Sequence, residues 1–289
     1  MSEDLKEKHG TTGHSWDGIE ELNTPLPRWW LWTFYACIVW GVIYTVMYPA
    51  WPLVNRATAG VLGYSTRAEV AADIDAVNAA NANINEQLAG VDLAKLTTGG
   101  DLQTYAVSSG GAVFKTWCAQ CHGSGAAGAK GYPNLLDDDW LWGGDIETIH
   151  ETITVGIRQP ADAEGDYLRQ SQMPAFGRDE LLEEGDIDAV VNYVMSLSGT
   201  PRDASMVDHG ATVFEENCAS CHMEDGTGDR GQGAPNLTDA IWLYGGDFDT
   251  LKETVWNSRY GQMPAWGDRL TEAQIRAVSA YVHQLGGGE

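Results

Sequence analysis

The longest apolar stretch of the chain runs from Trp29 to Trp51 and contains no charged side chain. At 23 residues it exceeds the ~20 that a helix needs to cross the hydrocarbon core of a bilayer. Aromatic residues crowd its two ends, as they do in the aromatic belts of membrane helices. A cleavable secretory signal is the alternative, but the apolar part is too long and no small-residue cleavage site follows it. We therefore predict an uncleaved transmembrane helix over residues 29–52, after an N-terminal segment of residues 1–28.

Helical periodicity organises the rest of the chain. An Ala- and Asn-rich segment near residues 66–89 predicts a helix, which lies within a connector of residues 53–103. Apolar residues at helical spacing recur in two later segments, which begin at Ile187 and Ile275. We predict an all-α chain in which the connector is followed by two tandem domains, residues 104–200 and 201–289.

The two predicted domains are copies of one sequence unit, because short strings recur in the same order. These strings are Gly-Xaa-Pro-Asn-Leu (131–135 and 233–237), Trp-Leu-aromatic-Gly-Gly-Asp (140–145 and 242–247) and Gln-Met-Pro-Ala-aromatic (172–176 and 262–266). A repeat of this kind predicts one folding unit used twice.

Each copy opens with Cys-Xaa-Xaa-Cys-His, at Cys118, Cys121 and His122 and again at Cys218, Cys221 and His222. In this arrangement two thiols add to the two vinyl groups of one haem, and the adjacent imidazole lies beneath the iron. A thioredoxin-like dithiol or half of a zinc site is the alternative, but neither needs the histidine. The sequence therefore predicts two covalently bound c-type haems. The fifth cysteine, Cys37, lies in the apolar run and is interpreted as a small hydrophobic residue.

The repeated unit resembles a class I cytochrome c domain, in which a methionine before the last helix is the second axial ligand. By motif, the resemblance implies that Met173 serves the first haem and Met263 the second. Ligation of one haem by His150, His209 or His283 is the alternative. The resemblance also implies that the carbonyls of Pro133 and Pro235 accept the free N–H of each axial histidine. Candidate contacts to the haem propionates are Trp140, Trp242, Arg158 and Arg259.

The copies differ in length, because 55 residues separate the first Cys from Met in one and 45 in the other. The extra segment, near residues 159–170, is polar and predicts a surface loop. A docking element and a neutral insertion are both open interpretations of it.

The chain is strongly acidic, with a formal net charge of −24 at pH 7. Residues 101–199 carry 5 basic and 16 acidic side chains, and residues 200–289 carry 6 and 14. This balance excludes nucleic acid and anionic lipid headgroups as partners, and it suits a donor cytochrome c with a basic surface. Acidity for solubility alone is the alternative.

The strings Asp17-Gly-Ile-Glu20 and Pro25-Leu-Pro-Arg-Trp-Trp30, followed by Tyr48-Pro-Ala-Trp-Pro52, resemble the membrane-anchored dihaem subunit III of cbb3-type cytochrome c oxidases. The resemblance covers the whole chain. It implies that the subunit accepts electrons from a soluble or membrane-bound cytochrome c. It further implies that electrons pass to a monohaem cytochrome c subunit and then to a haem–copper subunit, where oxygen is reduced.

In this interpretation the chain is a non-catalytic electron-transfer subunit without an oxygen-reducing site. Because haem is attached to such motifs outside the bacterial cytoplasm, we expect residues 53–289 in the periplasm and residues 1–28 in the cytoplasm, across the inner membrane. Two other functions compete. A stand-alone membrane-anchored dihaem cytochrome shares every haem feature, and a dihaem peroxidase-like enzyme would need an open axial position.

Overall fold

The computed structural model describes residues 3–159 and 169–289, which fall into two compact units, Met1–Ala80 and Asn81–Glu289. The first unit contains α1 (Glu3–His9), β1 (Thr11–Trp16), β2 (Ile19–Leu22), α2 (Arg28–Met47) and the first part of α3 (Thr66–Gly90). The all-α prediction holds apart from the antiparallel β1–β2 hairpin. Its turn is Asp17-Gly18, with φ of 52° and 80°. Asp-Gly is a common turn of two-residue hairpins, so this strand pair has a local sequence signal.

Helix α2 confirms the apolar helix predicted near the N-terminus, and it is the one described helix long and apolar enough to span a membrane. It ends at Met47, earlier than the predicted end at residue 52. The reason is Pro49, which disfavours helical backbone in the residue before it, and Tyr48 is accordingly extended (φ −114°, ψ 160°). Twenty residues still span about 30 Å, the thickness of the hydrocarbon core.

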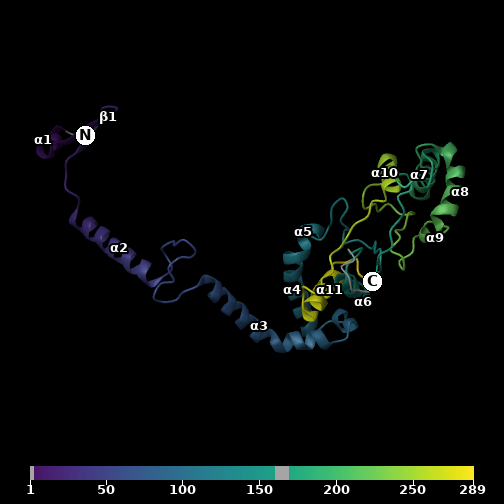
Figure 1. The fold of residues 1–289 in the computed structure, drawn as a ribbon, viewed down its shortest axis with the longest axis horizontal. Helices are drawn as coiled ribbons and strands as arrows, with labels where there is room; N and C mark the ends of the chain where they lie inside the picture. The colour runs from purple at the N-terminus through teal and green to yellow at the C-terminus, as the bar shows by residue number, and fades with distance from the viewer. Residues whose placement is uncertain (1–2, 160–168) are drawn as a thin grey trace. The chain divides into compact units, whose positions relative to one another are not determined.

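The second unit contains the end of α3 and two successive helical repeats (Figure 1). The first repeat comprises α4 (Asp101–Val113), the π-helical turn η2 (Phe114–Cys118), α5 (Ala119–His122), α6 (Ile146–Val155) and α7 (Glu184–Ser198). The second comprises α8 (Val207–Asn217), α9 (Ala219–His222), α10 (Phe248–Asn257) and α11 (Glu272–His283). Short 3₁₀ turns, η1 (Leu93–Thr97) and η3 (Ala204–Met206), precede α4 and α8.

Side-chain caps fix where the helices of each repeat begin. The carboxylates of Asp145 and Asp247 accept the backbone N–H of the third residue of α6 and of α10. At the start of α11, Thr271 and Gln274 form a reciprocal capping box. Because the same cap recurs at α6 and α10, the repeat seen in the sequence is a repeat of local structure.

The last helix of each repeat packs against the first helix of the other repeat. Helix α11 packs against α4, and α7 packs against α8 (Figure 1). Both crossings depend on a glycine. A Cβ at Gly110 would lie 2.5 Å from the carbonyl carbon of Ala277, and one at Gly210 would lie 2.6 Å from that of Ala189. The two last helices are thus exchanged between the repeats.

Two hydrophobic cores result from this packing of the helices. The first core joins Phe114, Ile149 and Ile153 to Trp266, Ile275 and Val278. The second core lies within one continuous stretch, from Met173 to Trp256, and includes Val190, Phe214 and Leu251. Only residues 199–206 separate α7 from α8, so packing these two helices together closes a short loop and costs little loop-closure entropy. Helices α4 and α11 then pair with each other.

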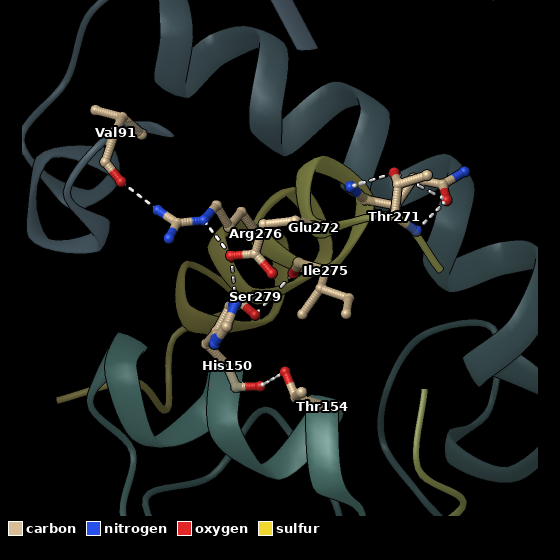
Figure 2. Close-up of polar contacts among 9 residues, drawn as sticks. Val91, His150, Thr154, Thr271, Glu272, Ile275, Arg276 and Ser279 are labelled. Carbon is tan, nitrogen blue, oxygen red and sulfur yellow. Dashed lines mark hydrogen bonds and ion pairs between the residues drawn. The ribbon is translucent and has the colours of Figure 1, made fainter. Parts of the chain in front are cut away.

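A third cluster fastens the end of the connector to the first core. Leu88 and Leu96 are buried with Ala106, Ile146 and Ala277, from α4, α6 and α11. Polar contacts support this junction (Figure 2). Glu272 accepts from His150 (3.1 Å) and from Arg276, whose guanidinium also donates to the carbonyl of Val91.

Candidate haem sites

Each Cys-Xaa-Xaa-Cys-His string begins just before a short helix, which follows the first helix of its repeat and carries the second cysteine and the histidine. In the first repeat the π-helical turn η2 carries Cys118, α5 carries Cys121 and His122, and Gly123 (φ 79°) ends the helix. In the second repeat α9 carries Cys221 and His222. The two thiols and the imidazole are therefore presented on one short segment beside a hydrophobic core.

The two motif histidines are held by the prolines that the resemblance had implied. The Nδ1 atom of His122 lies 3.2 Å from the carbonyl oxygen of Pro133, and that of His222 lies 3.1 Å from the carbonyl oxygen of Pro235. A carbonyl only accepts, so each Nδ1 carries the proton and each Nε2 keeps a free lone pair. Burial lowers the pKa of both rings, although the hydrogen bond to proline opposes this shift. A neutral ring with a free Nε2 is a metal ligand.

The environment of the first cysteine in each motif does not suit a reactive dithiol. Burial raises the pKa of Cys118 and of Cys218 to about 11, and the neighbouring Cys thiol adds to the shift. Dithiol oxidoreductases instead need a thiol pKa near or below neutrality. The Cys-Xaa-Xaa-Cys pairs are therefore interpreted as attachment points rather than as a redox dithiol.

The methionines are exchanged together with the closing helices. Met263 forms two backbone hydrogen bonds of 3.0 Å with Ile157, at the end of α6, and packs in the first core with Cys118. The backbone carbonyl of Met173 accepts a hydrogen bond from the hydroxyl of Ser258, which directly follows α10. The Met173 side chain packs in the second core with Cys218. The structure thus packs Met263 in the core beside the first motif and Met173 in the core beside the second, whereas chain order would pair Met173 with the first motif.

The histidines proposed as rival ligands have other partners on the surface. His150 contacts Glu272 (3.1 Å), His209 contacts Asp186 (2.8 Å), and His283 contacts the backbone carbonyl of Glu289 (2.9 Å). The first cysteine of each motif therefore shares a core with a methionine, and the three rival imidazoles contact other groups.

The candidate propionate contacts have unlike surroundings. Trp140 packs against the first core and donates to the carbonyl of Gly287, while Trp242 packs against the second core. Arg158 lies where the chain crosses between the cores and donates to the carbonyl of Gly261 (3.2 Å). Arg259 follows the end of α10. The two arginines are not structurally equivalent.

Sequence reasoning missed the residue that matches Arg259. Arg259 pairs with Glu253 (2.9 Å) and lies 4.8 Å from the centroid of the Tyr244 ring. Arg169 likewise pairs with Glu151 (2.6 Å), and its guanidinium carbon lies 5.2 Å from the centroid of the Trp142 ring. Both arginines stand four residues before the methionine of a Met-Pro pair. Counting back from methionine, rather than forward from cysteine, would have found Arg169.

The polar insertion predicted near residues 159–170 falls mostly on residues 160–168, which lie outside the described part of the chain. Its last two residues, Arg169 and Gln170, belong to the repeat rather than to the insertion, because Arg169 matches Arg259.

The two cores meet through matching loops. Gly131 donates its backbone N–H to the carbonyl of Leu243 (2.9 Å), and a Cβ at Gly131 would lie 3.3 Å from the Tyr244 ring. In the equivalent contact Gly233 faces the ring of Trp142. The same loop of each repeat therefore contacts the other, as in an interface between two copies related by two-fold symmetry.

Three family models match separate parts of the chain. The model described as the N-terminal domain of cytochrome oxidase-cbb3, FixP, matches residues 8–55. The model described as cytochrome c matches residues 107–198. The model described as cytochrome c oxidase, cbb3-type, subunit III, matches residues 205–282. The matches follow the order of anchor, first repeat and second repeat.

Curated relatives match over nearly the full length of the chain. It is 60% identical over 287 residues to the cbb3-type cytochrome c oxidase subunit CcoP of Cereibacter sphaeroides, with 98% of both chains covered. It is 54% identical over 292 residues to CcoP of Rhodobacter capsulatus, again with 98% of both covered. It is 50% identical over 279 residues to the cbb3-type subunit FixP of Sinorhizobium medicae, which covers 96% of this chain and 95% of the relative.

Proposed function

Because the chain belongs to the subunit III family of cbb3-type cytochrome c oxidases, we propose that it carries electrons on two covalently attached c-type haems with crossed axial ligands. It is an electron-transfer subunit of the oxidase, and its cytochrome c domains bind haem. The first haem would be held by Cys118, Cys121, His122 and Met263. The second would be held by Cys218, Cys221, His222 and Met173.

The residues present fit this group. Each core contains the first cysteine of one motif and one methionine thioether. The second cysteine and the imidazole follow on the same short segment, and the Nδ1 atom of the imidazole faces a proline carbonyl, which leaves Nε2 for the iron. When bound, haem supplies a one-electron iron couple, whose potential is higher with thioether than with a second imidazole. The chain fixes the ring plane of each histidine through proline and surrounds the site with apolar side chains such as Trp266 and Phe176. Both features favour outer-sphere electron transfer over chemistry at the metal.

The observation that carries the crossed assignment is the composition of the two cores. Met263 packs with Cys118, and its backbone is paired with Ile157. Met173 packs with Cys218 and is fixed by Ser258. If Met173 were instead the ligand of the first haem and Met263 that of the second, each methionine would have to leave the core in which it is packed.

The test removes one haem and then asks which methionine serves the other. A chain with Cys118→Ala and Cys121→Ala keeps only the second motif. Adding Met173→Ala is expected to abolish the methionine–iron charge-transfer absorbance of the remaining haem and to lower its potential. Adding Met263→Ala instead is the matched control and is expected to leave the absorbance in place. The opposite pattern would establish chain-order ligation.

We also propose that α2 anchors the chain in the bacterial inner membrane with the haem domains in the periplasm. Its length and lack of charge support a single membrane crossing, and attachment of c-type haem outside the cytoplasm supports the orientation. Trypsin added to intact spheroplasts is expected to release the haem-staining domains by cleaving after exposed Arg56 or Arg67. Release only after the membrane is broken would reverse the orientation.

As partners we propose the haem–copper subunit, a monohaem cytochrome c subunit and a donor cytochrome c. Membership of the oxidase family supports the first two, since the chain is a subunit of a larger complex. The acidity of the haem repeats supports a basic donor. Cytochrome-dependent oxygen uptake by the complex purified through this chain, together with b-type and c-type bands in its reduced spectrum, tests this. A purely c-type spectrum without oxygen uptake would contradict it.

A further inference from the structure

We propose that the donor cytochrome c docks on the face around the second haem motif, so that electrons reach the second haem before the first. This inference rests on the proposed function, since it assumes two haem sites that exchange electrons with a donor. It concerns the surface formed by residues 213–235, which we call the second motif face. The equivalent surface of the first repeat, residues 113–133, is the first motif face.

The two faces carry opposite charge although they are copies of one unit. The second motif face has five acidic residues and one basic residue, whereas the first has two basic residues and no acidic one. Position by position, the acidic residues of the second face are replaced by neutral or basic residues in the first. The pairs are Glu215 and Lys115, Glu216 and Thr116, Glu224 and Ser124, Asp225 and Gly125, and Asp229 and Ala129.

The negative charge of the second face is available to a partner. Glu215, Glu216 and Glu224 are exposed, and none of the ion pairs formed by residues 3–159 and 169–289 involves them. The basic residue of this face, Arg230, is occupied by a bidentate pair with Glu289 (2.8 and 2.5 Å). The field around the second motif is therefore negative at neutral pH.

An exposed apolar residue lies beside the attachment point on this face. Met223 directly follows His222, adopts a left-handed backbone (φ 64°) and has 47% of its surface exposed. Transient redox complexes combine such an apolar contact with a charged rim, because the rim speeds encounter while the contact brings the redox groups together. The second motif face has both parts, because Met223 supplies the apolar contact and the acidic residues of the face supply the charged rim.

The first motif face has a different surface. Trp117 is 45% exposed beside Cys118, and the charged residues of this face are Lys115 and Lys130, which repel a basic partner. The first core is also the one on which the connector packs, through Leu88 and Leu96. Of the two motif faces, the second is therefore the one whose charge attracts a basic donor.

The test uses the complete oxidase complex and mitochondrial cytochrome c, a small basic protein, as the probe. The variant Glu215→Gln, Glu216→Gln, Glu224→Gln removes three charges from the second motif face without altering the haem ligands. Its matched control, Asp101→Asn, Glu147→Gln, Glu183→Gln, removes three exposed carboxylates outside both motif faces. A second control, Lys115→Gln with Lys130→Gln, alters the first motif face.

Equilibrium binding at low ionic strength is the primary measurement. We expect Kd for the probe to rise about tenfold in the Glu215 variant, within the range that electrostatic attraction contributes to association, and to change little in either control. The difference should vanish in 0.5 M salt, where the Debye length falls to a few ångströms. It should also vanish for cytochrome c whose lysines have been acetylated.

Three results would overturn the proposal. These are an unchanged Kd in the Glu215 variant, an equal rise in the carboxylate control, and weaker binding after loss of Lys115 and Lys130. Oxygen uptake with a small reducing dye as donor is measured in parallel and should stay constant, because the dye does not need the docking surface. Failure of the wild-type complex to take up oxygen with the dye as donor would instead refute the proposed function. The single variant Glu224→Gln provides the same comparison if the triple variant assembles poorly.

Discussion

Replacing Gly110 by alanine tests the crossing of α4 with α11. The new Cβ would lie 2.5 Å from the carbonyl carbon of Ala277 and 2.9 Å from the Cβ of Tyr281, whereas ordinary contacts begin near 3.4 Å. Because the first obstacle is backbone, α11 has to move away by roughly 1 Å, and a gap of that size forfeits a quarter to a half of the dispersion energy of each contact. Overpacking of this kind costs about 1–3 kcal/mol.

The higher helix propensity of alanine offsets up to about 1 kcal/mol of this cost. We therefore expect Gly110→Ala to destabilise the first core by about 1–2 kcal/mol. The measurement is the denaturant midpoint for loss of the methionine–iron absorbance of the first haem. Gly125→Ala is the control, because a Cβ there meets nothing within 4 Å and the backbone does not have a positive φ. Equal midpoints for the two variants would refute the close crossing of α4 and α11.

Three further predictions concern charged groups. Arg169→Gln removes the ion pair with Glu151 and is expected to lower the free energy of unfolding by about 1.5–3 kcal/mol, the range for a hydrogen bond to a charged group, with Arg178→Gln as an exposed control. Burial raises the pKa of Glu272, but hydrogen bonds and charge attraction from Arg276 and His150 together outweigh burial and lower the pKa of this carboxyl below its usual value. The stabilisation by the Glu272 carboxylate is thus present above pH ~4.5 and is lost as the pH falls further. Glu272→Gln should remove this pH dependence, which is measured as the free energy of unfolding against pH. Burial and nearby carboxylates raise the pKa of Asp139 to about 6, so stability falls as pH rises from about 4 to 6. Asp139→Asn should therefore be more stable at pH 7 by on the order of 1 kcal/mol after allowance for solvent screening, and an unchanged melting temperature would contradict this.

The candidate site was predictable where its signal is local. Cys118, Cys121 and His122 act as one short string, and the proline that orients the histidine lies only 11 residues further along the chain. The apolar helix was equally clear, although its end depended on the effect of Pro49 on the preceding residue. Arg169 was missed because an insertion separates it from the cysteines, while its distance to methionine matches the other repeat.

By itself, the sequence determined the two Cys-Xaa-Xaa-Cys-His motifs, the repeat, the apolar helix and the charge contrast between the motif faces, because each is a property of neighbouring residues. Tertiary structure alone decided which closing helix and which methionine join each motif. The repeats present nearly identical helix-crossing surfaces, with Gly110 and Gly210 at equivalent positions, so local pattern does not distinguish the two possible pairings. The choice depends on the lengths of the connections and on contacts across the whole unit, and it places Met263 with Cys118 and Met173 with Cys218.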